Sequence, residues 1–219
     1  MIWPNVATRY FGVFKKYADI EQEEDKLPEI KFDHLMRMTD SFGILHHAKY
    51  SKPAPRYGYS TDDNARALIT VIRRYKAKPE PGLIPVLKTY LRFIKFVKRP
   101  DGYFANIVSS RKQKDKTNDE DVFGRTVWAL GYATASDFLP KEIHSEAHRL
   151  FSKSLKIIPR LKSPRAIAFA MNGLYVYLKR FPKKSLEQIF RKLADRQVAL
   201  YENYYSKEWN WFEDQLTYS

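Results

Sequence analysis

The feature that most constrains the fold of this chain is an alternation between two kinds of helical segment. Three segments are predicted to be inner helices, apolar on most sides, and they begin near residues 61, 120 and 163. Three others carry one apolar stripe, and they cover residues 85–99, 141–158 and 186–205. A helix that is apolar on most sides has to be surrounded by protein, whereas a helix with one stripe lies at a surface. The alternation therefore predicts two concentric layers of antiparallel helices.

We therefore predict an all-α protein with the architecture of an α/α toroid. A further inner helix is expected from Phe212 onward, which makes the toroid incomplete, with about four hairpins. Residues 27–219 are assigned to this domain, and residues 1–26 to an acidic, extended N-terminal segment. A helical solenoid is the alternative, but the chain shows only loose repetition in place of the fixed period that solenoids have.

Composition narrows the possible classes of protein. The 219 residues include no cysteine, which excludes disulfides and thiolate metal sites and favours a reducing compartment. The chain contains no stretch of the roughly 20 apolar residues that a membrane span needs, and its first residues lack an apolar leader. We expect a cytoplasmic protein that does not contact a membrane.

The formal charge of +14 is concentrated in residues 70–116 and 149–192, where basic residues far outnumber acidic ones. Such a surplus is typical of nucleic-acid-binding proteins. No recognition-helix, RNA-binding or zinc-finger pattern accompanies it, so solvated outer faces of helices are the preferred interpretation, and a nucleic-acid partner is not expected.

The histidines do not form a metal-binding pattern. Adjacent residues such as His46 and His47 do not share a helical face, and no matching ligand spacing follows them. The sequence also lacks a glycine-rich phosphate loop and a nucleophile motif. We expect no metal and no cofactor, and we assign His46 and His47 to a structural loop or to hydrogen bonding with a substrate.

A short repeat places acidic and basic residues at equivalent points of two inner helices. The stretch from Asp62 matches the stretch from Asp121 as D-x-x-[AG]-R-[AT]-[LV], which aligns Arg66 with Arg125. Because each outer helix carries the chain back, all inner helices begin at the same end of the toroid. Asp62, Asp121 and Glu213 are therefore predicted to meet around one cavity.

Acidic residues in a first helical turn also have a purely structural explanation, because the helix dipole stabilises each by roughly 0.3–1 kcal/mol. Several acidic helix starts that share a rim with aromatic residues favour a ligand instead. Aromatic faces combined with carboxylates and amides suit sugars, which have apolar faces and a fringe of hydroxyl groups. The expected ligand-binding side chains are Tyr59, Asp63, Asn64, Arg66, Arg125, Arg165, Trp209, Trp211 and Asp214, together with His46 and His47.

Acid–base chemistry on a sugar would need two carboxyl groups in different environments. A carboxyl group enclosed by aromatic side chains favours its protonated form, which makes Glu213, in the stretch WNWFED, the predicted proton donor. Asp62 or Asp121 is the predicted base.

Four stretches of the chain resemble a known family: residues 27–68, 120–131, 163–178 and 209–219. They are similar to the bacterial α/α-toroid domain that often accompanies family 4 glycosyltransferases, within the wider six-hairpin glycosidase-like group. The resemblance implies an all-α barrel and a role in carbohydrate metabolism. Its motif positions here are Asp62, Asp63, Asn64, Arg66, Asp121, Arg125, Arg165, Glu213 and Asp214. Related sequences typically have Gln-His where this chain has His46-His47.

A complete toroid of six hairpins at roughly 50 residues each would need about 300 residues. The chain is therefore expected to be a fragment or split form completed by a second chain, or an open barrel. The leading hypothesis is a glycosidase-like domain that acts on an oligosaccharide or glycoside. A non-catalytic sugar-binding or scaffolding module that partners a glycosyltransferase is the alternative, and a basic nucleic-acid-binding protein is the third.

Overall fold

The computed structural model describes residues 3–17, 30–211 and 213. The chain divides into two units, residues 1–32 and residues 33–219. In the first unit, helix α1 (Trp3–Tyr17) is amphipathic, with Tyr10 and Phe14 in ring contact at 6.3 Å. Residues 3–17 are thus helical, where the sequence had indicated an extended segment, and the two units divide after residue 32.

The second unit consists mainly of helices. Its elements are α2 (Asp33–Met38), β1 (Ala48–Lys49), β2 (Lys52–Pro53), η1 (Pro55–Tyr57), β3 (Tyr59–Ser60), α3 (Thr61–Ala77), α4 (Leu83–Val97), β4 (Ile107–Val108), α5 (Glu120–Ala135), α6 (Lys141–Ser154), η2 (Ile158–Arg160), α7 (Pro164–Arg180) and α8 (Lys184–Tyr204). The strands form only two short antiparallel pairs, β1 with β2 and β3 with β4.

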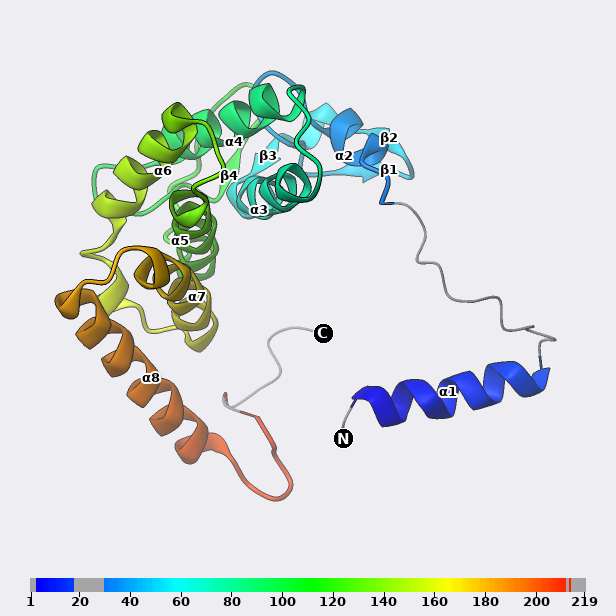
Figure 1. The fold of residues 1–219 in the computed structure, drawn as a ribbon, viewed down its shortest axis with the longest axis vertical. Helices are drawn as coiled ribbons and strands as arrows, with labels where there is room; N and C mark the ends of the chain where they lie inside the picture. The colour runs from blue at the N-terminus through cyan, green and yellow to red at the C-terminus, as the bar shows by residue number, and fades with distance from the viewer. Residues whose placement is uncertain (1–2, 18–29, 212, 214–219) are drawn as a thin grey trace. The chain divides into compact units, whose positions relative to one another are not determined.

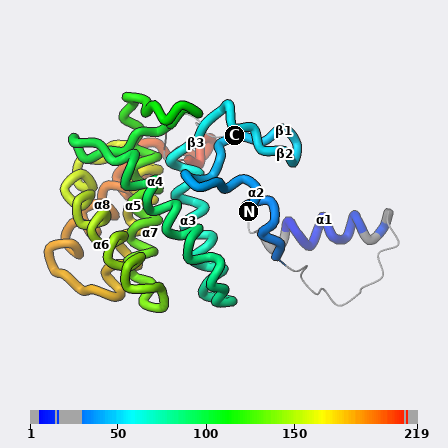
Figure 2. The backbone as a smooth tube through the Cα atoms, turned by 90° about the horizontal axis from the view of Figure 1, so that it is seen from above, coloured from blue at the N-terminus to red at the C-terminus, as the bar shows by residue number. Residues whose placement is uncertain are grey.

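The long helices of this unit lie in two layers. Helices α3, α5 and α7 contact one another in succession, and each is followed by an outer helix that packs against it: α4, α6 and α8. Figure 1 shows the three inner helices nearly end-on along the concave side of an arc, with α4 and α6 outside them. In the view from above, α3, α4, α5 and α7 run alongside one another (Figure 2). The predicted all-α, toroid-like fold is confirmed.

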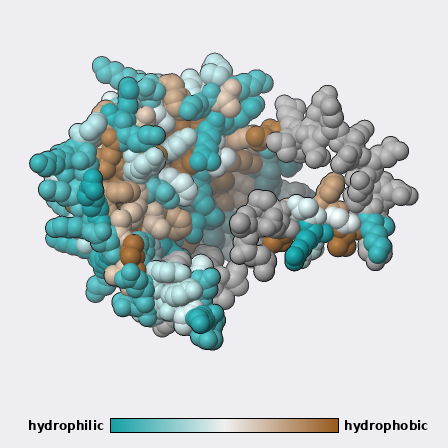
Figure 3. Space-filling view, turned by 60° about the horizontal axis from the view of Figure 1, so that its bottom comes forward, coloured by the Kyte–Doolittle hydropathy of each residue, from teal (hydrophilic) through white to brown (hydrophobic). Residues whose placement is uncertain are grey.

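The inner helices are buried because their apolar side chains face neighbours on several sides. Val127 and Leu130 of α5 are fully enclosed, as are Ile167 and Leu174 of α7. The face seen in the space-filling view has hydrophilic residues along its margins and apolar residues between them (Figure 3). The further inner helix that we predicted from Phe212 onward falls on residues 212 and 214–219, outside the described part of the chain.

The loop between α4 and α5 is held against the start of α3. Its Ile107 and Val108 pair with β3, and the Thr61 hydroxyl donates a hydrogen bond to the carbonyl of Ala105 at 2.6 Å. The Thr61 amide donates to the carbonyl of Asn106 at 2.8 Å. These bonds bring residues 105–119 to the N-terminal ends of the inner helices.

Glycines allow α5 and α7 to approach closely. A Cβ atom at Gly173 would lie 2.6 Å from the carbonyl oxygen of Val127, and one at Gly131 would collide with the carbonyl of Gly173. Both would meet backbone atoms, which cannot rotate aside as a side-chain end can. The spacing of α5 and α7 therefore depends on these glycines.

Gly173→Ala is expected to lower the free energy of unfolding by about 1–3 kcal/mol, because overpacking of a backbone contact outweighs the better helix propensity of alanine. Chemical denaturation measures this change. The matched control is Gly82→Ala, where a Cβ atom would meet nothing within 4 Å. An equally stable Gly173→Ala protein would show that the close approach is not required.

Candidate functional site

A cavity of about 790 Å³ lies where α3, α5 and α7 begin. The α4–α5 loop forms part of its wall. Its lining residues are His46, Ser60, Asp62, Asp63, Arg66, Asn106, Ile107, Thr117, Asn118, Asp119, Glu120, Asp121, Val122, Arg125, Ser163 and Arg165. The structure thus brings together most of the acidic and basic residues that the sequence had placed at the helix starts. We call this space the acidic cavity.

Ion pairs connect successive inner helices across the acidic cavity. The Nε atom of Arg125 on α5 lies 2.9 Å from Oδ1 of Asp62 on α3. The Nε atom of Arg165 on α7 lies 3.1 Å from Oδ2 of Asp121 on α5. In both pairs the aspartate belongs to the earlier helix and the arginine to the next one. The same polar groups therefore line the cavity and connect the inner layer.

Asp62 is the carboxyl group whose environment is most unusual. Its side chain is 18% exposed, and it also pairs with Arg66 of its own helix at 2.6 Å. Within the described residues, its buried Oδ1 atom accepts no hydrogen bond, although Arg125 is close. Burial raises the pKa of Asp62, against the opposing effect of the two arginines. Burial therefore favours the protonated form of Asp62, while Arg66 and Arg125 favour the ionised form.

Asp63 belongs to a more exposed cluster beside Asp62. Its two oxygens contact Nδ1 of His46 at 2.8 Å and Nη2 of Arg66 at 2.7 Å. His46 therefore lines the cavity. His47 instead packs its ring against Tyr57, at 4.6 Å between ring centroids, and is not one of the cavity-lining residues.

The start of α5 is tied to the start of α7 by hydrogen bonds. Oε2 of Glu120 accepts the amides of Lys162 and Ser163, both at 2.6 Å. The Ser163 hydroxyl donates to Oδ1 of Asp121 at 2.6 Å and, as the N-cap of α7, accepts a hydrogen bond from the Ala166 amide. These bonds fix the positions of both acidic residues in the cavity.

Asp119 is the residue that caps α5. Its Oδ1 atom accepts the amides of Asp121 and Val122, at 2.9 and 3.1 Å. Helix capping therefore explains Asp119 but does not explain Glu120 or Asp121, whose side chains contact other elements.

The inner helices carry an aromatic surface that was not predicted from the sequence. Arg125, Trp128 and Tyr132 occupy one partly exposed side of α5, and Phe169 lies opposite on α7. The Trp128 and Phe169 rings are nearly parallel, at 9° and 6.0 Å between centroids. The guanidinium group of Arg125 lies 4.3 Å from the Phe169 centroid. Because Arg125 also lines the acidic cavity, this aromatic surface adjoins it.

Two predicted ligand-binding residues, Tyr59 and Asn64, are not among the residues that line the acidic cavity. Tyr59 is 4% exposed, donates a hydrogen bond from its hydroxyl to Asp40 at 2.5 Å and accepts one from Lys112 at 2.8 Å. Asn64 is fully buried, and its side chain bonds to the backbone of Ile44 and Ser60. The polar atoms of both side chains are therefore already hydrogen-bonded to backbone groups or to neighbouring side chains.

The predicted proton donor is not brought to the acidic cavity. The indole nitrogen of Trp209 donates to the carbonyl of Glu213 at 2.6 Å, and that of Trp211 lies 3.4 Å from Oε2 of Glu213. None of these three residues lines the cavity. Asp214, the other expected residue in this segment, lies outside the described residues.

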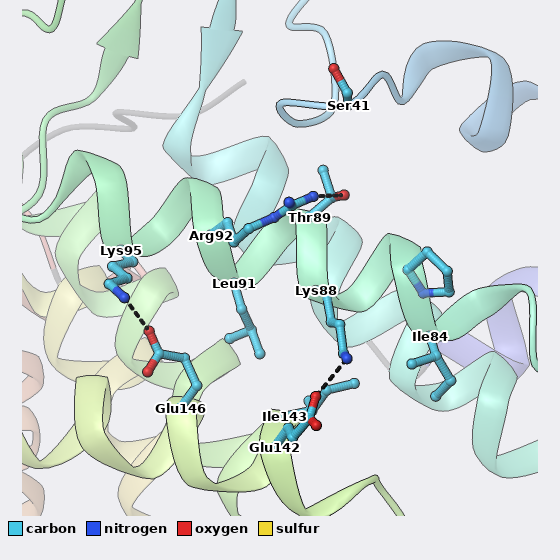
Figure 4. Close-up of a pocket in the computed structure, with 11 residues that line it drawn as sticks. Ser41, Ile84, Lys88, Thr89, Leu91, Arg92, Lys95, Glu142, Ile143 and Glu146 are labelled. Atoms are coloured by element: carbon cyan, nitrogen blue, oxygen red, sulfur yellow. Dashed lines mark hydrogen bonds and ion pairs between the residues drawn. The ribbon is translucent and has the colours of Figure 1, made fainter.

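A second groove, of about 670 Å³, runs between outer helices α4 and α6 (Figure 4). Lys88 and Glu142 bridge it with an ion pair of 2.6 Å, and Lys95 and Glu146 with one of 3.5 Å. None of the predicted site residues lines this groove.

The described residues contain neither a metal-binding cluster nor a membrane-spanning helix. No three His, Asp or Glu side chains gather there as ligands of a metal ion would. None of the described helices combines the length and the apolar character of a membrane span.

Because Arg125 lies beside Asp62, a substitution of Arg125 should change the pKa of Asp62. Because the fold raises the pKa of Asp62, its contribution to stability is fully present below the ordinary value of 3.8 and is lost as the pH rises through the folded value. Arg125→Gln removes a cation that opposes the shift. The pKa of Asp62 is expected to rise further, as an NMR titration of the side-chain carboxyl carbon measures.

The control variant is Arg180→Gln, since Arg180 pairs with the exposed Asp137. It should leave the titration of Asp62 unchanged. An unchanged or lower pKa of Asp62 in Arg125→Gln would contradict the assignment of this ion pair.

No protein-family profile matches the chain, and no curated protein matches it. Among solved structures, one titled as a sugar epimerase from a ruminal bacterium is similar to this chain, with a TM-score of 0.62 and 13% sequence identity. The match covers 78% of this chain and 51% of that structure, so the chain spans about half the length of its structural relative. At this identity the similarity shows that the two proteins share a helical fold.

Proposed function

We propose that the acidic cavity binds a neutral saccharide, and that the domain acts on it by acid–base chemistry. The observation that carries the proposal is the meeting of five carboxyl and three guanidinium groups beside the aromatic surface of Trp128 and Phe169. Carboxylates and guanidinium groups suit sugar hydroxyls, and aromatic rings suit the apolar faces of sugar rings. The excess of acids disfavours an anionic sugar. The similarity of fold to a sugar epimerase supports a sugar ligand.

The proposed proton donor is Asp62, because burial raises its pKa. Asp121, paired with Arg165 and bonded to Ser163, is the proposed base. This reverses the role that the sequence analysis favoured for Asp62, since Glu213 does not line the cavity. In glycoside hydrolysis, Asp62 would protonate the departing oxygen while Asp121 activates a water molecule.

A non-catalytic sugar-binding module is the second candidate, and a specific observation favours it. Asp62, Asp63 and Asp121 each contact an arginine. Asp63 also contacts His46, and Asp121 also contacts Ser163. Carboxyl groups with such partners can still accept hydrogen bonds from hydroxyl groups, but proton transfer would require the ion pairs to rearrange. Binding without turnover is therefore consistent with the same cavity.

For the partner, we propose a glycosyltransferase or a second chain that completes the ring. The exposed side of the last described hairpin supports this proposal. A groove of about 480 Å³ between α7 and α8 is lined by Tyr175, Phe190 and Tyr201, among others. Tyr175 is 51% exposed, and Tyr201 43%. Aromatic residues exposed in a groove are typical of a surface that another helix covers.

Tyr175→Arg with Tyr201→Arg is expected to abolish complex formation with a co-expressed glycosyltransferase, because the charges cannot be buried in the groove. Light scattering after size-exclusion chromatography measures the mass of the complex. The control is Lys184→Glu with Lys192→Glu on the solvated side of α8, which should leave the complex intact. A complex that survives the tyrosine substitutions would contradict this location.

The catalytic proposal predicts different effects for acidic and aromatic substitutions. Asp62→Asn and Asp121→Asn should each lower kcat by at least about 10²-fold while saccharide binding persists, because general acid–base catalysis contributes about that much. Trp128→Ala should weaken binding by about tenfold or more through loss of stacking. Calorimetry and product analysis on a panel of oligosaccharides measure both effects, with Asp137→Asn as the control.

The products distinguish the possible reactions. New reducing ends would indicate hydrolysis. Isomeric sugars that incorporate deuterium from the solvent would indicate epimerisation. Binding without turnover in the unmodified protein would favour the binding module. Failure to bind any saccharide would reject the proposed function.

A further inference from the structure

A second cluster of charge lies on the outer layer and is strongly basic. It lines a pocket of about 550 Å³ formed by the C-terminal part of α4, the C-terminal part of α6 and the turns that follow them. The cations that line it are Lys95, Lys98, Arg99, Arg149, Lys153 and Lys156, against the single acid Asp101. We call this space the basic pocket.

The acidic residues nearby neutralise only part of this charge. Asp101 pairs with Arg99 at 2.7 Å. Glu146 pairs with Arg149 at 2.7 Å and with Lys95 at 3.5 Å, the latter pair being visible in Figure 4. For Lys98, Lys153 and Lys156, no ion pair occurs within the described parts of the chain.

Lys98 is the most enclosed of these three lysines. Its ammonium group donates a hydrogen bond to the carbonyl of Gly102 at 3.2 Å and lies 4.7 Å from the centroid of the Phe104 ring. Burial lowers the pKa of Lys98, and the charges of Lys153 and Lys156 lower it further, while Asp101 opposes the change. Lys153 and Lys156 are therefore close enough to Lys98 to repel its ammonium group, and an anion bound among them would relieve this repulsion.

Helix electrostatics accounts for only part of the cluster. A cation near the last turn of a helix is stabilised by the dipole, which explains Lys95 on α4 and Lys153 on α6. Lys98 and Lys156 follow the ends of these helices, and both contribute to the same pocket. The convergence of the lysines thus needs a further explanation.

We propose that the basic pocket binds a small phosphate-bearing anion, such as a phosphate monoester or a diphosphate. Lysine side chains bind phosphate groups as point charges, and several of them around one pocket suit a compact group with multiple negative charges. A nucleic acid would instead require cations spread along a stripe that follows successive phosphates. This site is separate from the saccharide site and does not depend on the proposed function.

Arg99 connects the basic pocket to the acidic cavity. Besides pairing with Asp101, it donates hydrogen bonds to the carbonyls of Lys116 and Thr117, both at 3.0 Å. Thr117 lines the acidic cavity. The loop that forms one wall of the saccharide site is therefore anchored by a residue of the basic pocket.

Isothermal titration calorimetry with inorganic phosphate and pyrophosphate tests the proposal, at low ionic strength in a buffer without phosphate or sulfate. The intact chain should bind both ligands saturably, with pyrophosphate the tighter. Lys153→Glu with Lys156→Glu should weaken binding at least about tenfold. Both lysines are exposed, so the variant is expected to fold, as circular dichroism would check.

The matched control is Lys184→Glu with Lys192→Glu, which changes the net charge equally on exposed positions of α8. This control should bind pyrophosphate with an affinity within about twofold of that of the unmodified protein, a much smaller change than the roughly tenfold loss expected for the pocket variant. Equal loss in both variants would show a response to net charge alone and would overturn the proposal. Lack of phosphate and pyrophosphate binding would also overturn it, as would tight, salt-dependent binding of a single-stranded oligonucleotide in their place.

Discussion

The candidate site depends on ion pairs that join each inner helix to the next. Asp62 of α3 holds Arg125 of α5, and Asp121 of α5 holds Arg165 of α7. Because all three helices begin at the same end of the layer, these pairs meet around one cavity. Partly buried ion pairs are costly to break when one partner is removed, so stability and the polarity of the site are coupled here. Close packing of α5 and α7 through Gly173 keeps the helices near enough for these contacts.

Much of the architecture could be predicted from hydrophobic patterning. The alternation of inner and outer helices predicted both the all-α class and the common direction of the inner helices. The repeat that aligns Asp62 with Asp121 identified two residues that line one cavity. This succeeded because helix direction alone determines which ends meet. The function inferred from this cavity stays a proposal.

Other parts of the site depend on side-chain contacts that patterning does not specify. Tyr59 and Asn64 stand beside the acidic residues in sequence, yet backbone groups and Asp40 occupy their polar atoms. Trp128 and Phe169 were missed because they looked like core residues of helices that are apolar on most sides. The spacing of Trp128 three residues after Arg125 was the available signal, since it places both on one side of α5. Glu213 was assigned to the site because aromatic residues surround it in the sequence. Trp209 and Trp211 do contact Glu213, but outside the acidic cavity.

Opposite charges lie at the two ends of the α4–α5 and α6–α7 loops. Lysines surround the ends of the outer helices, and carboxyl groups surround the starts of the inner helices. The central claim is that a saccharide occupies the acidic inner cavity. The most direct measurement is an NMR titration of the isotopically labelled chain with an oligosaccharide, following assigned backbone amides. The account predicts shifts concentrated in residues 60–66, 117–128 and 163–169. Shifts confined to the groove between α4 and α6, or to α8, would contradict it.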